Sequence, residues 1–327
     1  MNGSNGQTMQ SLFALTTKLI DYAGLFPPAK LNLAQAFNNY LMYRMGNYRW
    51  MLNKFLITSK QLPVLTKLMS KMDTVDDGFP VPFSIIGSGG NDEKSFLKNL
   101  KSDIKLINDF RKANSQSSSV NTFEVRLPEK ILEETSVSSI VELMSEVSDE
   151  FIYSSENEMM VFYEASSKNN FNDVVTNVAE AVSNLNGMAG FKLRTGGTEP
   201  SAFPTPEEVA YAIIACCEYS IPMKCTAGLH HPIRHFNEKE KVNMHGFLNV
   251  FCGGILAHTC DLDEHELAQV LNDDNAGSFE FADDEFVWKD YDVSNREIKD
   301  ARDNLMISFG SCSFDEPISD LKTLELL

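Results

Sequence analysis

Residues 190–228 contain a strand, a helix and a second strand: GFKLRTGGTEPSAFPTPEEVAYAIIACCEYSIPMKCTAG. Both ends of this stretch alternate apolar and polar side chains, as a strand with two different faces does. Between them, TPEE at 205–208 predicts a helix start, because it supplies an N-cap threonine, a proline at the first helical position and a capping-box glutamate. Val209, Ile213 and Cys216 follow at helical spacing. The stretch therefore predicts one unit of a parallel sheet.

The same unit recurs along the chain. Seven candidate strands have centres 28 to 40 residues apart, which is the length of one strand and one helix. The 327 residues also lie within the size range of one α/β barrel. We therefore expect an α/β fold, a single-domain (β/α)8 TIM barrel over 1–327, with a disordered tail at 1–10 and an irregular insertion at 230–294. The strand centres are Asp21, Phe55, Phe83, Phe123, Phe162, Phe191 and Met223.

The eighth strand has two candidate positions. One is a hairpin pattern at 279–288, where two aromatic segments flank a pair of aspartates. The other is MISFGSCSF at 306–314, which follows a helix-like stretch at 296–305. We favour 306–314, because its Gly/Ser-rich end would then lie at the mouth of the barrel.

The composition excludes several classes of protein. With 28 Lys and Arg against 46 Asp and Glu, the formal net charge is −18, so we expect no nucleic-acid partner. No apolar run approaches the roughly 20 residues that cross a bilayer, so we expect no membrane association. A polar, uncharged N-terminus and six cysteines without a CxxC pair predict a reduced, cytoplasmic protein.

Charged side chains share one face of the predicted strands four to seven. Four cations and two carboxylates do not balance, and an unpaired buried ion is costly. We expect the surplus positive charge to bind a small anionic, carbonyl-bearing substrate at the C-terminal mouth, where barrels of this class carry their chemistry. An internal salt-bridge network that fills the barrel is the alternative. The residues are Glu124, Arg126, Glu164, Lys192, Arg194 and Lys224.

Lys192 and Lys224 lie on adjacent predicted strands, with Arg194 beside them. Neighbouring cations in a closed pocket disfavour the charged form of an amine. We therefore expect the pKa of Lys192 to be lowered, so that its amine can act as a nucleophile toward a carbonyl.

Three short motifs, VFYEAS at 161–166, FKLRTGG at 191–197 and KCTAG at 224–228, carry a family resemblance. In this order they resemble the fifth, sixth and seventh strands of class I aldolases of the deoxyribose-phosphate aldolase type. In that family a glutamate strand precedes a Lys-x-[Ser/Thr]-x-Gly strand with the Schiff-base lysine. A Lys-x-x-Gly-Gly strand follows, and its lysine lowers the pKa of the first. The resemblance covers residues 159–229.

The resemblance implies a role for each matching residue. Lys192 would form the Schiff base, Lys224 would assist it, and Glu164 would be the strand-five glutamate. Glu124 and Asp21 are candidates by position for the acidic proton relay.

The sequence also departs from this aldolase pattern. Arg194 replaces a small hydroxyl residue, and GLHHP at 228–232 replaces the glycine pair that helps to bind phosphate. Together, DYAGLFPPA, FKLRTGG, KCTAGLHHP and SFGSCSFDEP resemble a bacterial TIM-barrel family without an assigned activity.

Backbone N–H groups at two strand ends are further candidates for anion binding. Gly196 and Gly197 follow strand six, and Gly310 and Ser311 lie at the Gly/Ser-rich end of the predicted strand eight. Together with Arg194 and Arg126 they form the expected substrate-binding set, because guanidinium binds carboxylate and phosphate in a bidentate way. Ordinary turns are the alternative for the glycines.

Histidines beyond strand seven suggest a different chemistry. As single side chains, His230 and His231 are candidate acid–base or substrate-binding groups. With Asp21 or Glu164, either histidine would instead complete a catalytic metal site. Adjacent residues of an extended loop point apart, so we do not expect both histidines to bind one ion.

The leading hypothesis is a barrel enzyme that acts on a small anionic carbonyl or sugar-like metabolite through a Schiff base on Lys192. This is a lyase of the aldolase type, for which we expect no cofactor. The second hypothesis is a metal-dependent isomerase or hydrolase that uses His230 or His231, and the third is a non-catalytic binding barrel. The oligomeric state stays open, a homo-oligomer included.

Overall fold

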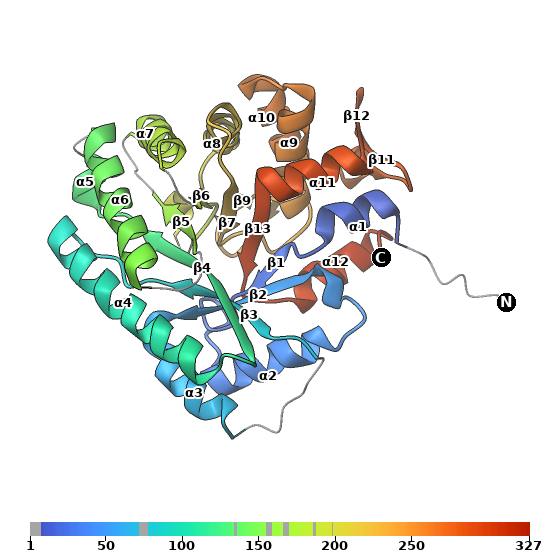
Figure 1. Cartoon of the computed structure of the whole chain (residues 1–327). Coiled ribbons are helices and arrows are strands. Elements are labelled where there is room, and N and C mark those ends of the chain that lie inside the picture. The colour runs from blue at the N-terminus through green and yellow to red at the C-terminus, as the bar shows by residue number, and fades with distance from the viewer. Residues whose placement is uncertain are drawn as a thin grey trace.

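Eight parallel strands close into one barrel at the centre of the molecule (Figure 1). The computed structural model describes residues 8–71, 78–133, 136–154, 159–165, 170–185, 188–197 and 199–327. Around the barrel the strand order is β1, β13, β7, β6, β5, β4, β3, β2. The predicted (β/α)8 TIM barrel is confirmed. Its strands are β1 (Ile20–Tyr22), β2 (Leu52–Thr58), β3 (Val81–Ile86), β4 (Ser118–Arg126), β5 (Met160–Glu164), β6 (Ala189–Arg194), β7 (Met223–Thr226) and β13 (Met306–Ser311).

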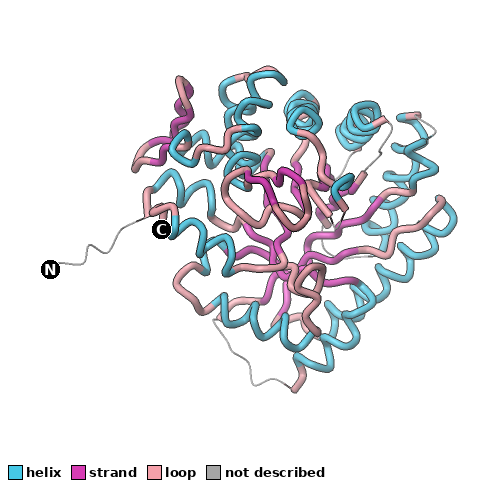
Figure 2. The backbone as a smooth tube through the Cα atoms, turned by 180° about the vertical axis from the view of Figure 1, so that it is seen from behind, coloured by secondary structure: helices cyan, strands magenta, loops and turns pink. Residues whose placement is uncertain are grey.

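Helices surround this barrel, as the view from behind shows (Figure 2). Every connection between successive barrel strands contains at least one helix. None of the helices within the described ranges is long and apolar enough to cross a membrane. The helices are α1 (Gln10–Thr16), α2 (Leu33–Arg44), α3 (Leu62–Met69), α4 (Glu93–Ala113), α5 (Glu129–Glu133), α6 (Val137–Ser154), α7 (Phe171–Ser183), α8 (Pro206–Glu218), α9 (Phe247–Cys260), α10 (Glu264–Asn272), α11 (Asn295–Asn304) and α12 (Asp315–Thr323).

The predicted helix start at TPEE is confirmed. Glu208 N donates to Thr205 Oγ1 at 3.2 Å, and Thr205 N donates to Glu208 Oε2 at 2.7 Å. These reciprocal bonds satisfy two backbone donors that the first turn of α8 would otherwise leave without a partner.

The eighth barrel strand is β13, the placement that we favour from the sequence. It pairs in parallel with β1 and β7. The aromatic pattern at 279–288 instead belongs to a separate antiparallel sheet of β10 (Glu280–Phe281), β11 (Glu285–Trp288) and β12 (Tyr291–Ser294). A second small sheet joins β8 (His235–Asn237) to β9 (Val242–Met244). These sheets and α9 and α10 lie in the segment expected to be irregular.

From residue 10 onward, the N-terminal segment is bonded to the rest of the protein. Residues 1–7 of the expected tail lie outside the described residues. Gln10 begins α1, and Ser11 N donates to Ala282 O at 3.1 Å. The end of the expected tail is therefore a helix that is bonded to the loop after β10.

Aromatic side chains fill the layer between strands and helices. Phe37 of α2 lies 5.5 Å from Phe55 of β2 between ring centroids, and Phe110 of α4 lies 5.4 Å from Phe83 of β3. Successive strand residues point to opposite faces. The residues that alternate with these aromatics therefore face the barrel interior, and that is where the charged side chains of β4 to β7 lie.

All six cysteines lie within described ranges and carry free thiols. Cys216, Cys225 and Cys252 have no exposed surface. Burial raises the pKa of Cys225 to about 12, so its thiol is a poor nucleophile near neutral pH. These cysteines contribute to the core as small apolar residues.

Candidate active site

A chain of six charged side chains of alternating sign fills the barrel interior. In contact order these are Asp21, Lys224, Glu124, Lys192, Glu164 and Arg194, from β1, β7, β4, β6, β5 and β6. The strand register aligns them, because Lys192 is the partner of Lys224 on β7 and of Glu164 on β5. Five of the six are buried. Arg194 keeps 39% of its side chain exposed, at the C-terminal end of β6.

Glu124 is the centre of this chain and has no exposed surface. Its Oε1 lies 2.5 Å from Lys224 Nζ, and its Oε2 lies 2.9 Å from Lys192 Nζ. Ser84 Oγ of β3 also donates to Oε1, at 2.6 Å. One carboxylate therefore joins both lysines.

Asp21 ends the chain on the β1 side. Its Oδ2 accepts from Lys224 Nζ at 2.6 Å and from Ser308 Oγ at 2.7 Å. Its Oδ1 accepts from Asn53 Nδ2 at 2.8 Å and from Lys54 N at 3.0 Å. With four donors, this fully buried carboxylate is satisfied on both oxygens.

Glu164 connects Lys192 to the mouth of the barrel. Its Oε2 lies 2.8 Å from Lys192 Nζ. Its Oε1 accepts two bonds from Arg194, from Nη2 at 2.8 Å and from Nε at 3.0 Å. A ligand that enters at the mouth would thus meet Arg194 before Lys192.

The contacts among these six side chains determine the pKa values of the two lysines and of Glu124. Burial acts to lower the pKa of Lys192, but Glu124 and Glu164 outweigh it and raise that pKa. Asp21 and Glu124 likewise outweigh burial and raise the pKa of Lys224. Burial acts to raise the pKa of Glu124, and the two lysines lower it well below its ordinary range. The expected lowering of the Lys192 pKa is therefore wrong, because its nearest neighbours are carboxylates rather than cations.

The expected surplus of positive charge in this layer is also corrected. Asp21 adds a third carboxylate, so the chain contains three cations and three anions. Arg126 does not share the interior. At the end of β4 its side chain is 52% exposed, and its Nη2 lies 2.6 Å from Glu129 Oε1. It therefore belongs to the mouth.

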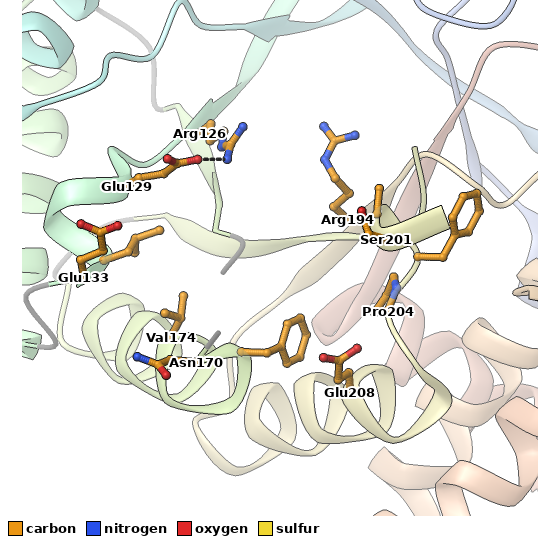
Figure 3. Close-up of a pocket in the computed structure, with 13 residues that line it drawn as sticks. Arg126, Glu129, Glu133, Asn170, Val174, Arg194, Ser201, Pro204 and Glu208 are labelled. Carbon is orange, nitrogen blue, oxygen red and sulfur yellow. Dashed lines mark hydrogen bonds and ion pairs between the residues drawn. The ribbon is translucent and has the colours of Figure 1, made fainter. Parts of the chain in front are cut away.

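A pocket of about 630 Å³ lies at the C-terminal ends of β4 and β6, beside α5, α7 and α8. Along one side of it lie Arg126, Glu129 and Arg194, and Glu133 and Glu208 lie on the rest of its margin (Figure 3). Its volume is within the range of small-molecule sites. Two of the predicted substrate-binding residues, Arg126 and Arg194, thus line one cavity.

The glycine candidates have structural roles. A Cβ on Gly196 would lie 2.7 Å from the ring of Phe203 and 2.8 Å from Gly228 Cα, and one on Gly197 would lie 2.7 Å from Ala202 Cβ. Gly310 lies inside β13 beside Asp21, and Ser311 Oγ donates to Ser313 O at 2.6 Å. Close packing and pairing account for these four positions, and anion binding there stays a prediction.

The histidines contact α12 instead of the barrel carboxylates. His230 Nδ1 lies 3.4 Å from Glu316 Oε2, and His231 Nδ1 lies 2.6 Å from Asp320 Oδ2. Asp21 instead contacts Lys224, and Glu164 contacts Lys192 and Arg194. In the part of the chain that the structure describes, no three His, Cys, Asp or Glu side chains are grouped to hold a metal ion. The histidine and carboxylate ligands that a metal-dependent isomerase or hydrolase would need are therefore not brought together in the described residues.

Neither a family model nor a curated protein matches this chain. The closed barrel agrees with the TIM-barrel part of the resemblance. For the aldolase part of the resemblance, the support comes from the arrangement of the interior residues alone.

Four polar residues around the six interior charges were not predicted from the sequence. Ser84 and Ser308 bond to Glu124 and Asp21, Asn53 bonds to Asp21, and Lys54 lies at the N-terminal end of the same interior. The signal was available for Lys54, because it alternates with the apolar Phe55 in the predicted strand. The serines gave none, because a small hydroxyl residue is common in buried strands.

Replacing Glu124 by glutamine should strongly destabilise the fold. Glu124→Gln removes the charge that both buried lysines contact, and breaking a buried ion pair costs about 3–5 kcal/mol. Urea unfolding near neutral pH measures this. Glu129→Gln, which disrupts the exposed pair with Arg126, is the control and should leave the free energy of unfolding nearly unchanged. A loss for Glu124→Gln no larger than the control's would contradict the buried chain.

Acid should weaken the fold through Glu164. Burial acts to raise the pKa of Glu164, but Lys192 and Arg194 lower it from 4.5 to about 2. The stability that this carboxylate contributes is therefore complete above pH 4.5 and is lost as the pH falls toward 2. The difference in unfolding free energy between wild type and Glu164→Gln should shrink over this interval. A difference that stays constant with pH would contradict the assigned pKa shift.

Proposed function

We propose that this protein is a lyase of the class I aldolase type, in which Lys192 forms an imine with a small anionic carbonyl compound. One observation carries the proposal: a single buried carboxylate, Glu124, contacts the amines of Lys192 and Lys224 from adjacent strands at the same register. The same lysine pair, on the sixth and seventh strands, underlies the resemblance to the deoxyribose-phosphate aldolase type.

Proton transfer is the first requirement of this chemistry. Because its pKa is raised, Lys192 is an ammonium before substrate arrives, and an ammonium cannot attack a carbonyl. Glu124 and Glu164, at 2.9 and 2.8 Å, hold this proton on Lys192, so its loss is the costly step that substrate binding has to promote. Lys224 stays protonated beside Glu124 and stabilises negative charge on it. Lys224 is thus a positioning residue that acts through Glu124.

The reaction then needs no group beyond the chain and water. Lys192 Nζ attacks the carbonyl carbon, and the carbinolamine loses one water to form the imine. In the cleavage direction, a base removes the proton of the substrate's β-hydroxyl. The carbon–carbon bond breaks toward the protonated imine, whose nitrogen takes up the electron pair to give an enamine, and an aldehyde leaves. Protonation of the enamine and addition of water release the second product and restore Lys192.

An anionic group on the substrate is supported by the two arginines. Arg194 donates two bonds to Glu164 while it also lines the mouth pocket, so a substrate carboxylate or phosphate can bind beside Lys192. Arg126 lines the same pocket from β4. Glu133 and Glu208 on the margin disfavour a ligand with several negative charges. The substrate that fits best is a small monoanion.

Borohydride trapping tests the proposal. Incubation with a panel of short aldehydes and 2-keto acids, followed by reduction, should add the mass of one reduced adduct to the peptide that contains Lys192. Lys192→Met should abolish this adduct. Lys60→Met, at an exposed lysine far from the interior chain, is the matched control and should leave the yield unchanged.

Lys224→Met adds a graded readout. It should slow adduct formation without moving the adduct to another lysine, because Lys224 acts through Glu124. Absence of an adduct with every carbonyl compound, or an undiminished adduct in Lys192→Met, would overturn the imine proposal. Absence of any adduct would favour the non-catalytic binding barrel.

A further inference from the structure

A second cavity lies at the end of the barrel opposite to the mouth. It has a volume of about 970 Å³, and its lining includes Met160, Ala189 and Ile307 at the N-terminal ends of β5, β6 and β13. The chemistry of barrel enzymes lies at the C-terminal face. This cavity is therefore separate from the pocket at Arg126 and Arg194, and its size suits a small molecule.

Lys54 of β2 is the lysine that lines this cavity. Its Nζ donates to Oγ1 of Thr122, and among the described residues no carboxylate lies within ion-pair distance of it. Lys192 and Lys224, in contrast, each contact two carboxylates. An ammonium carries three donors. Lys54 therefore has hydrogen-bonding capacity that the described side chains leave unused.

The interior chain does not neutralise Lys54. Its three cations and three anions balance each other, so Lys54 is a surplus positive charge at the N-terminal end of the barrel. Burial lowers the pKa of Lys54. Asp21 and Glu124 oppose this effect, and Lys224 acts in the same direction as burial. An anion bound beside Lys54 would favour its charged form and make a charge-assisted hydrogen bond.

The walls of this cavity indicate which chemical groups a ligand would carry besides the anionic group that pairs with Lys54. About half of the residues that line the cavity are apolar, and the acidic group in the lining, Asp303, contacts Lys299. A phosphate alone would leave these apolar walls without a partner. The apolar residues include Met160, Phe162, Val182, Leu185, Ile221 and Ile307.

We propose that this cavity is a binding site for a small carboxylate with a short apolar body, whose head group pairs with Lys54. The apolar body would contact the walls, and burial of its surface would add affinity. This site does not depend on imine chemistry at Lys192.

Calorimetry with a matched set of ligands tests the site. Hexanoate should bind, and hexanol, hexylammonium and inorganic phosphate should bind at least about tenfold more weakly, because each lacks the charge or the apolar body. Lys54→Met should weaken hexanoate binding by a similar factor, and Lys54→Arg should retain most of it. Lys60→Met, at an exposed lysine that does not line the cavity, is the control and should leave it unchanged.

A measurement on the wild-type protein keeps the test valid if Lys54→Met does not fold. Hexanoate should slow acylation of Lys54 by acetic anhydride, as read by peptide mass spectrometry, and should leave acylation of exposed Lys60 unchanged. Three results would overturn the proposal: no hexanoate binding, undiminished binding in Lys54→Met, or no protection of Lys54. None of them affects the trapping test for Lys192.

Discussion

The burial of Glu124 is the constraint on which the barrel interior depends. A carboxylate without exposed surface is stable only where opposite charges contact it. Lys192 and Lys224 meet that need from adjacent strands, and they in turn require Glu164 and Asp21. Each buried charge is thus stabilised by an oppositely charged neighbour. The row of charges ends at Asp21, which accepts from four donors, and at Arg194, which reaches the mouth.

This arrangement gives the two ends of the barrel different properties. At the C-terminal end, Glu164 is shared by a buried lysine and a partly exposed arginine, so an anionic ligand can compete for the arginine. At the N-terminal end, Lys54 is not balanced by the chain. The six charges balance each other, Lys54 adds positive charge at the N-terminal end of the barrel, and Arg194 shares Glu164 at the C-terminal end. These two features underlie the two separate binding sites that we propose.

The alternation of side chains was sufficient to predict the barrel and most of its interior. Phe123, Phe191 and Met223 identified the faces of their strands, so Glu124, Lys192 and Lys224 were predicted to share one interior. The net charge of that interior could not be predicted. Asp21 belongs to a strand of three residues, too short for alternation to assign its direction. Arg126 alternates correctly, but at the last residue of β4 its long side chain reaches solvent. Asp21 raises the pKa of Lys224, whereas Glu124 and Glu164 raise that of Lys192; alternation predicted that these two carboxylates share the interior but not that they contact Lys192.

A nitrogen NMR titration of the lysine amines tests the central claim most directly, because it measures the charge on Lys192 itself. Since Glu124 and Glu164 hold the ammonium form, Lys192 should titrate above the ordinary lysine value of 10.5. In Glu124→Gln the midpoint should move to lower pH, because one of the two stabilising carboxylates is gone. A midpoint at or below 10.5 in the wild type, unchanged in the variant, would contradict the alternating chain.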